Sequence, residues 1–287
     1  MPIRYVIVIY VGLYFQLIDM ISVSKAILVV SFGTSYNDSR TRTIGAIESM
    51  IADKYSDWDV RRAFTSKMII KKLAERDNER IDYVSDALER LVSDGIKDVI
   101  VQPTHIMNGL EYDDVVRIVD EYKGSFDSLS LGKPLLTTEE DFDHVVYAIG
   151  SSLVAEAHSI AGKDTAVILM GHGSEHFSNA VYSQLYLKLR LNGYQDVHVT
   201  TVEGFPSFED TIELMKEKRY ENVVLFPFML VAGDHASNDM AGDDSDSLKC
   251  ILKRHGYNVH CVIKGLGEYN EFKELFLAHL DEVICNF

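Results

Sequence analysis

The chain has 287 residues, of which 47% are hydrophobic and 25% are charged, values that suit a globular protein of about two domains. Its net charge of −16 argues against a general nucleic-acid binder, because such proteins neutralise phosphates with clustered Lys and Arg. A polyanionic ligand would need a local basic patch. The cysteines Cys250, Cys261 and Cys285 are widely spaced and form no C-x-x-C, so neither a disulfide framework nor a zinc knuckle is expected.

The first 24 residues differ from the rest of the chain. Tyr5–Ile18 is almost wholly apolar behind the single Arg4, which is short for a membrane span but about the length of a signal-peptide core. Met20 is an alternative first residue, so residues 1–24 are either signal-like or a misassigned start. A cytoplasmic location is favoured, and an exported one follows if the segment is a signal. The globular protein is expected to begin near Lys25 in both cases.

From residue 25 onward, short Val/Ile/Leu-rich runs alternate with longer segments that carry apolar residues at helical spacing. This pattern is typical of βαβ units and predicts an α/β fold with parallel sheets flanked by helices. A helix near 143–160 is expected to link an N-terminal half (25–142) to a C-terminal half (143–269), and a helix within 270–287 closes the chain. Strands are predicted near residues 26–31, 58–63, 98–102, 129–136, 166–170, 197–202, 223–228 and 258–263.

The two halves share two short patterns. Val29–Ser35 resembles Ile168–Ser174 as a strand, a tight glycine turn and a hydroxyl at a helix start. Pro103–Glu111 matches Pro227–His235 with the same internal spacing. Such self-similarity indicates a duplication. Two similar halves that face each other would enclose a cleft, with Glu111 on one lip and His235 on the other.

Three side chains able to bind a metal follow three successive strands of the C-terminal half. His172 lies in Gly-His-Gly after the run 166–170, Glu203 closes the run 197–202, and His235 follows the run 223–231. Ligands of open α/β sheets bind beyond the carboxyl ends of the strands, so these groups are expected to converge. Two imidazoles and a carboxylate suit a catalytic divalent metal. Taken singly, each histidine could be a turn residue and Glu203 a helix-capping partner.

Other motifs are weaker. The acidic run between Asp239 and Asp246 lacks the glycine and terminal Glu of an EF-hand loop. Gly171-His172-Gly173 and Gly265-Leu266-Gly267 stop short of G-x-G-x-x-G, and neither a P-loop nor G-x-S-x-G is present. No nucleotide cofactor is therefore expected. His105 is either a cleft residue or a satisfied buried histidine.

These residues belong to a longer, ordered set that resembles the anaerobic sirohydrochlorin cobaltochelatases, the CbiK type of class II chelatase. The resemblance implies a chelatase-like fold, with two similar halves around a tetrapyrrole cleft. It also implies ATP-independent insertion of Co²⁺ into sirohydrochlorin or a precorrin-2-type macrocycle for cobalamin biosynthesis. The similarity runs from about residue 25 to the C-terminus and includes Ser31–Ser35, Arg62–Ser66, Met68–Ile70, His105–Ile106, Asn108–Gly109, Glu111–Tyr112, Met170–Gly173, Leu230–His235, Asn238–Met240 and Gly265–Glu268.

The resemblance also suggests residue roles. His172, Glu203 and His235 would hold the Co²⁺ substrate, while a histidine and the cleft acid Glu111 would take protons from the macrocycle. Six residues near strand ends are candidates for substrate binding: Phe32, Phe64, His105, Met107, Phe205 and Met229. The macrocycle is a polycarboxylate, and cations that could meet it are Arg40, Arg42, Lys67, Lys71 and Lys72.

Two other functions remain open from the sequence. Imidazole and carboxylate accept iron as well as cobalt, so Fe²⁺ insertion for sirohaem or haem is an alternative. A non-enzymatic, exported haem- or metal-binding protein is the second. A homo-oligomer is possible, as for many soluble enzymes, and no nucleic-acid partner is expected.

Overall fold

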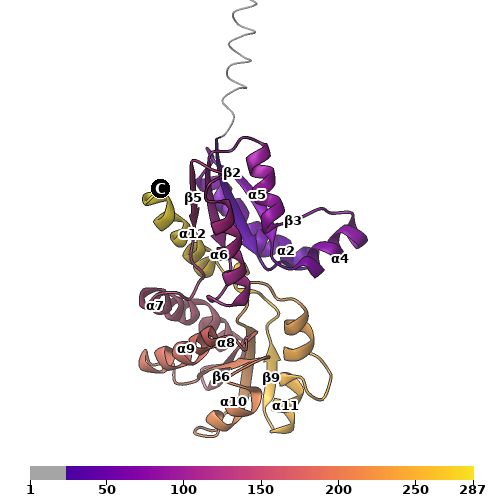
Figure 1. Ribbon diagram of the computed structural model, residues 1–287. Coiled ribbons are helices and arrows are strands. Elements are labelled where there is room, and N and C mark those ends of the chain that lie inside the picture. Colours follow the sequence, from indigo (N-terminus) through magenta and orange to yellow (C-terminus); the bar gives the residue numbers. More distant parts are fainter. Residues whose placement is uncertain (1–23) are drawn as a thin grey trace, which may run out of the picture.

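The computed structural model describes residues 24–287. The apolar N-terminal segment, predicted to be either signal-like or a misassigned start, lies outside the described residues. Figure 1 shows two α/β halves stacked one above the other, the N-terminal half uppermost. Within residues 24–287, no helix is long and apolar enough to cross a membrane.

The N-terminal half holds a five-stranded parallel sheet in the order β3-β2-β1-β4-β5. The predicted strands differ from this sheet in two places. β3 is absent from the prediction, because two residues are too few to produce an alternating pattern. The strand predicted over 129–136 ends earlier, at Leu131 of β5. The elements are β1 (Lys25–Ser31), α2 (Asn37–Arg42), α3 (Ile44–Lys54), β2 (Asp59–Phe64), α4 (Lys67–Asp77), β3 (Asp82–Tyr83), α5 (Val84–Ser93), β4 (Asp98–Pro103), α6 (Leu110–Tyr122) and β5 (Ser128–Leu131).

The C-terminal half holds a four-stranded parallel sheet in the order β7-β6-β8-β9. This order repeats that of β2-β1-β4-β5, as the predicted duplication requires. The elements are β6 (Thr165–Gly171), η2 (Phe177–Asn179), α9 (Ala180–Leu191), β7 (Val197–Thr201), α10 (Phe208–Met215), β8 (Asn222–Pro227), η3 (Ala236–Met240), α11 (Leu248–Arg254), β9 (Asn258–Cys261) and η4 (Leu266–Glu268).

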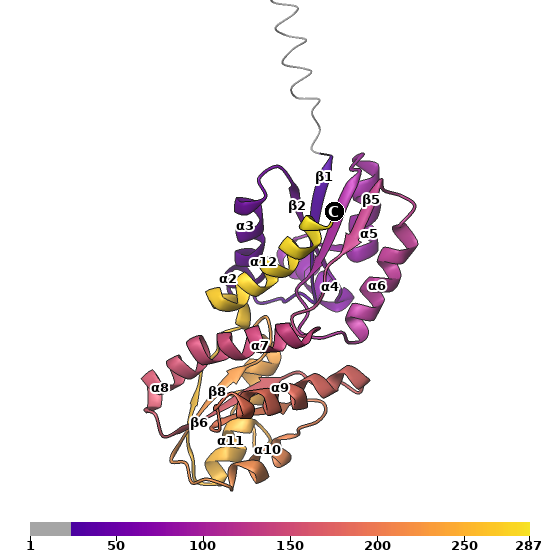
Figure 2. The ribbon, with the colours of Figure 1, turned by 90° about the vertical axis from the view of Figure 1, so that its left-hand side faces the viewer.

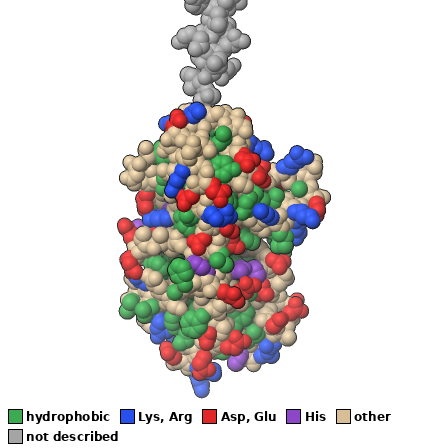
Figure 3. Space-filling view, viewed as in Figure 1, with side chains coloured by type: hydrophobic (Ala, Val, Ile, Leu, Met, Phe, Trp, Pro, Cys, Tyr) green, Lys and Arg blue, Asp and Glu red, His purple; other side chains and the backbone are tan. Residues whose placement is uncertain are grey.

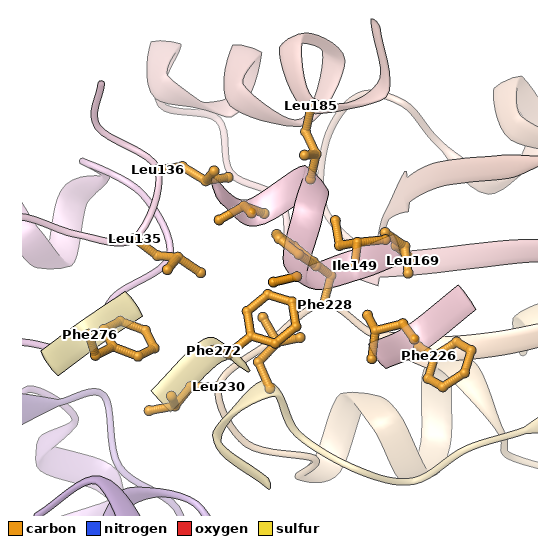
Figure 4. Close-up of a cluster of buried hydrophobic side chains, with 14 of the residues drawn as sticks. Leu135, Leu136, Ile149, Leu169, Leu185, Phe226, Phe228, Leu230, Phe272 and Phe276 are labelled. Carbon is orange, nitrogen blue, oxygen red and sulfur yellow. The ribbon is translucent and has the colours of Figure 1, made fainter. Parts of the chain in front are cut away.

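Alternate residues of the central strands enter different cores, because successive side chains of a strand point to opposite faces. In β1, Ile27 and Val29 enter a large cluster that also contains Leu169 of β6, while Leu28 and Val30 pack beneath α5 and α6. The large cluster is therefore common to both halves and holds them together. Figure 4 shows part of it, including Leu135, Leu136, Ile149, Leu169, Leu185, Phe226, Phe228, Leu230, Phe272 and Phe276.

Two helical segments connect the halves. The first is continuous from α7 (Glu139–Ala148) through the π-helical η1 (Ile149–Val154) to α8 (Ala155–Ala161), close to the predicted 143–160 helix. The second is α12 (Asn270–Cys285), which lies within the predicted range. Figure 2 shows α12 lying along the N-terminal half, although it follows the C-terminal sheet in sequence. The Lys54 Nζ–Asp281 Oδ2 distance of 2.6 Å ties α12 to α3.

A buried polar group joins α12 to the start of α7. The Asp141 carboxylate accepts hydrogen bonds from the Thr138 backbone N–H at 2.7 Å and from His279 Nε2 at 3.0 Å, and Lys133 Nζ lies 3.0 Å away. Burial alone would raise the pKa of Asp141, but the hydrogen bonds from Thr138 and Lys133 and the nearby His279 lower it overall. Burial also lowers the pKa of His279. The carboxylate is therefore favoured in the folded state.

We expect Asp141→Ala to lower the free energy of unfolding at neutral pH by about 3 kcal/mol, because it leaves buried donors without an acceptor. The pKa of Asp141 is depressed in the folded protein, so its contribution is present above about pH 4 and is lost as the pH falls through the folded-state pKa. Denaturant unfolding at several pH values measures both effects. A difference between wild type and variant that stayed constant down to pH 3 would contradict this linkage.

Candidate metal and substrate site

His172 and His235 follow two strands that are neighbours in space but not in sequence. β6 pairs with β7 on one side and with β8 on the other, so the chain reverses direction across the sheet between β6 and β8. Crevices at such reversal points are the usual ligand sites of open α/β sheets. The two imidazole rings lie there with centroids 4.7 Å apart and planes at 90°. The structure therefore brings the two predicted histidines together.

Both histidines use Nδ1 to bond the protein. His172 Nδ1 lies 2.8 Å from the carbonyl oxygen of Gly173, and His235 Nδ1 lies 2.7 Å from Asp239 Oδ2. Both partners can only accept, so Nδ1 carries the proton in each ring and Nε2 keeps its lone pair. His172 is exposed, and the side chain of His235 is 35% exposed. Two Nε2 lone pairs are thus available for a divalent metal.

The glycines around His172 are required by close packing. A Cβ on Gly171 would lie 2.2 Å from Cε1 of Tyr182, whose buried ring supports the turn from below. Gly173 has a φ of +84°, and a Cβ there would lie 2.2 Å from the carbonyl oxygen of Glu203. Burial raises the pKa of Tyr182 to about 12, so the phenol stays neutral beside the backbone of His172 and Gly173. The Gly-His-Gly motif is therefore a packing requirement of this turn.

Glu203 is held next to His172 through the backbone. Its N–H donates to the carbonyl oxygen of His172 at 2.7 Å, and its side chain is exposed. In residues 24–287, no group of three or more His, Cys, Asp or Glu side chains is close enough to hold a metal ion. The structure thus pairs the two histidines and places the backbone of Glu203 beside that of His172, while the role of Glu203 as a third ligand stays a prediction.

The loop after β4 lies at the junction with the C-terminal half. A Cβ on Gly109 would lie 3.7 Å from Ser178 Oγ of the C-terminal half, so the two halves meet here. Glu111 is exposed in the first turn of α6. Asp113, two residues further on, lies 3.5 Å from His176 Nε2 across the junction. In Figure 3, histidine side chains gather at the level where the two halves meet, beside an indentation of the surface.

The predicted substrate-binding residues divide into two groups. Phe32 and Phe205 are 47% and 59% exposed, and Met107 and Met229 are half-buried, so their role in substrate binding stays a prediction. Phe64 is wholly buried, so its prediction as a substrate contact is wrong. Its ring packs on Gly33, where a Cβ would lie 2.4 Å from Phe64 Cδ2.

His105 is also less available than predicted. Both of its ring nitrogens are buried without a hydrogen-bond partner, and burial lowers its pKa to about 4. The imidazole is therefore neutral at physiological pH. It cannot offer a ring nitrogen to a ligand without movement of the groups that cover it.

Three apolar side chains at the same sheet edges were missed by the sequence reasoning. Met68 follows β2 and is 72% exposed, Leu110 follows β4 and is 60% exposed, and Phe177 follows β6 and is 84% exposed. Large apolar side chains at such exposure are characteristic of ligand or interaction surfaces when they cluster. Their position a few residues beyond predicted strands was the signal that could have found them.

The matches to known proteins extend over nearly the whole described chain. The sequence model of the family described as "Cobalt chelatase (CbiK)" matches residues 25–285. The chain belongs to the cobalt chelatase family. The sirohydrochlorin cobaltochelatase of Salmonella typhimurium is 38% identical over 260 residues, which is 91% of this chain and 96% of the relative. The sirohydrochlorin cobaltochelatase CbiKC of Nitratidesulfovibrio vulgaris is 30% identical over 264 residues, 91% and 90% of the two chains.

Solved structures of chelatases share the fold of this CbiK-family chain. SirB from Bacillus subtilis, determined with Fe³⁺, matches with a TM-score of 0.64 and 18% identity over 91% of this chain and 96% of its own. CbiX, described as the terminal enzyme of sirohaem biosynthesis in denitrifying bacteria, matches with a TM-score of 0.55 and 14% identity, covering 90% of this chain and 99% of its own. The predicted chelatase-like α/β architecture is thereby confirmed.

In this chelatase, Gly173→Ala tests whether the turn geometry positions His172. We expect a loss of about 2 kcal/mol or more in unfolding free energy, from the positive φ and the contact with Glu203, and weaker Co²⁺ binding by the displaced imidazole. Calorimetric Co²⁺ titration and thermal unfolding measure the two effects. Gly193→Ala is the matched control, because Gly193 has a φ of +89° but no atom within 4 Å of a Cβ. Equal Co²⁺ affinity in the two variants would contradict the assignment.

Proposed function

We propose that this chelatase inserts Co²⁺ into sirohydrochlorin without ATP, as a lyase that forms nitrogen–metal bonds in cobalamin biosynthesis. The observation that carries the proposal is the imidazole pair at the β6–β8 reversal. Nδ1 of each ring bonds a protein acceptor, and among the described residues Nε2 of each ring has no hydrogen-bond partner. Family membership and two relatives named sirohydrochlorin cobaltochelatases support the choice of metal and macrocycle.

The metal is captured first. His172 and His235 supply two neutral nitrogen ligands, and the exposed carboxylate of Glu203 completes the set. The backbone hydrogen bond between Glu203 and His172 supports this assignment, since it keeps the two residues side by side. Neutral imidazole replaces water around the ion without trapping it, because an open site with few protein ligands leaves positions for the incoming macrocycle.

Metallation exchanges one Co²⁺ for two pyrrole N–H protons, so the site needs proton acceptors as well as ligands. An imidazole that leaves the metal can take the first proton, because its released Nε2 lone pair is a base. Glu111 then receives protons on the opposite lip and passes them to solvent. Its exposed position in the first turn of α6, on the junction between the halves, supports this role.

The macrocycle lies between the apolar side chains of the two halves in this proposal. Phe32 and Phe205 present large exposed rings from loops after β1 and β7, and the half-buried Met107 and Met229 follow β4 and β8. Leu110 and Phe177 extend the apolar surface on the two sides of the junction. Their combined exposure supports a flat, hydrophobic ligand, because exposed aromatic groups gain most by covering the face of another ring.

The carboxylates of the macrocycle meet α4. Of the predicted cations, Arg40 is buried in an ion pair with Glu79, and Arg42 pairs with Glu268 at 2.9 Å. Lys71 and Lys72 are exposed, and the nearest carboxylate to Lys71 is Glu75 at 3.8 Å. Lys67, on the same helix as Lys71 and Lys72, lies over the ring of Tyr83 from β3. Figure 3 shows basic side chains gathered over α4, which projects beside the indentation.

His235→Ala should reduce the initial rate of Co²⁺ insertion into sirohydrochlorin at least about a hundredfold, because it removes one of two nitrogen ligands. The rate is followed by the absorbance change of the macrocycle against the uncatalysed reaction, with ATP omitted. His144→Ala is the control, since His144 is an exposed histidine on α7, contacting only Glu140 at 4.0 Å among the ion pairs of the described chain. A His235→Ala rate close to wild type would remove the proposed site.

The same assay separates the alternative functions. Co²⁺ and Fe²⁺ are compared at equal concentration under anaerobic conditions, and a clear preference for Fe²⁺ would replace the cobalt assignment with sirohaem synthesis. A carrier would bind the tetrapyrrole, as seen by fluorescence quenching, without raising the rate of metallation above the uncatalysed reaction. Such a result would exclude the enzyme.

The double variant Lys71→Glu/Lys72→Glu tests the carboxylate surface. We expect the KM for sirohydrochlorin to rise about tenfold, because two attractive charges become repulsive, and the effect to shrink as salt screens it. Co²⁺ affinity should not change. Lys97→Glu, a single charge reversal just before β4 and far from the carboxyl ends of the strands, is the control for a change of surface charge. A KM equal to wild type at low salt would exclude α4 from substrate recognition.

A further inference from the structure

Asp239 contacts His235 on the side away from the free nitrogen. Asp239 Oδ2 lies 2.7 Å from His235 Nδ1, one helical turn further along the chain. The side chain of Asp239 is 41% exposed, so it is not a core residue. Among the described residues it forms no ion pair with a Lys or Arg. Within residues 24–287, the imidazole of His235 is the polar side-chain partner of Asp239.

The two histidines of the site are held by different kinds of acceptor. For His172 the acceptor is the carbonyl oxygen of Gly173, which belongs to the backbone and is fixed by the turn. For His235 it is a side chain. A carboxylate accepts only, so it requires the proton on Nδ1 and leaves the lone pair on Nε2. Ligating histidines are commonly oriented in this way by a partner on their second nitrogen.

The turn that carries Asp239 is well anchored. Ala236 and Met240 of η3 are wholly buried, and the Ser237 hydroxyl donates to the carbonyl oxygen of Gly233 at 3.0 Å. A Cβ on Gly242 would lie 2.2 Å from the carbonyl oxygen of Asn238, so the chain leaves the turn in close contact with it. These contacts fix the backbone on both sides of Asp239. The carboxylate is therefore held where it can accept the hydrogen bond from His235 Nδ1.

We propose that Asp239 is a positioning residue of the metallation reaction: it selects the His235 tautomer with a free Nε2 and holds the ring in its perpendicular arrangement with His172. This inference rests on the proposed function, because it assumes that His172 and His235 receive the Co²⁺ substrate. Asp239 itself does not contact the metal. Its effect is on the affinity of the histidine pair for Co²⁺, before any macrocycle binds.

The test measures Co²⁺ binding without turnover, in the full chain and without tetrapyrrole, by calorimetry and by the visible absorption of bound Co²⁺. Asp239→Ala removes the acceptor and should weaken Co²⁺ binding about 10- to 100-fold. Asp239→Asn keeps an oxygen that can accept from Nδ1 and should lose clearly less. Asp243→Ala is the charge-matched control, since Asp243 lies in the same acidic segment but pairs with Lys249 at 2.8 Å. It should bind Co²⁺ as wild type does.

Kinetics give a second measurement. The KM for Co²⁺ should rise in Asp239→Ala while the dissociation constant for sirohydrochlorin stays at the wild-type value. Thermal unfolding of the metal-free variants separates a folding defect from a site defect, and the near-isosteric Asp239→Asn keeps the test usable if the alanine variant is unstable.

The possible failures are distinguishable. If His172→Ala and His235→Ala leave Co²⁺ affinity unchanged, the proposed metal site itself is wrong. If those variants lose affinity but Asp239→Ala does not, only the positioning role is overturned. Equal losses in Asp239→Asn and Asp239→Ala would assign the effect to charge instead of orientation, and a similar loss in Asp243→Ala would assign it to the general acidity of the segment. Both outcomes contradict the proposal.

Discussion

The site depends on the pairing of β6 with β8, two strands that the chain visits with β7 between them. This pairing places the loop that carries His172 beside the loop that carries His235, and it leaves a crevice at the reversal of strand order. The other features of the site hold these two loops in position. The glycines allow the first loop to pack on Tyr182 and Glu203, and the buried residues of η3 hold the second loop in place.

A shared hydrophobic core holds the two halves together, so the loops that meet at their junction can keep apolar side chains exposed. Side chains from β1, β6, β8 and α12 contribute to one hydrophobic cluster. The returning helix α12 adds polar contacts to both α3 and α7. Because burial elsewhere supplies the stability of the junction, the loops at the carboxyl ends of the strands can keep residues such as Phe177 and Phe205 exposed. Exposed aromatic rings are unfavourable in water, and covering them with a flat ligand contributes favourable binding free energy.

The sequence was sufficient for the α/β class, seven of the strands to within about two residues, and the two histidines, since these depend on local patterns and on the general rule for strand ends. It could not identify which apolar residues would be exposed. Phe64 and Phe205 look alike as aromatic residues near strand ends, yet Phe64 ends β2 inside the core while Phe205 follows β7 in a loop. Similarly, Arg40 and Lys72 both follow early strands, and only the fold shows that Glu79 neutralises Arg40.

Polar partners were the least predictable part of the site. In the sequence, Asp239 is only the first member of the acidic run that ends at Asp246, because a sequence gives no information on which oxygen meets which nitrogen. The distinction matters for the chemistry. A chelatase must bind its ion firmly enough to remove water and loosely enough to release it to the macrocycle, so the orientation of each imidazole has to be set without adding a strong ligand. A carboxylate behind the ring and a backbone carbonyl behind its neighbour meet that requirement, since both direct Nε2 outward while their own oxygens are occupied by Nδ1–H.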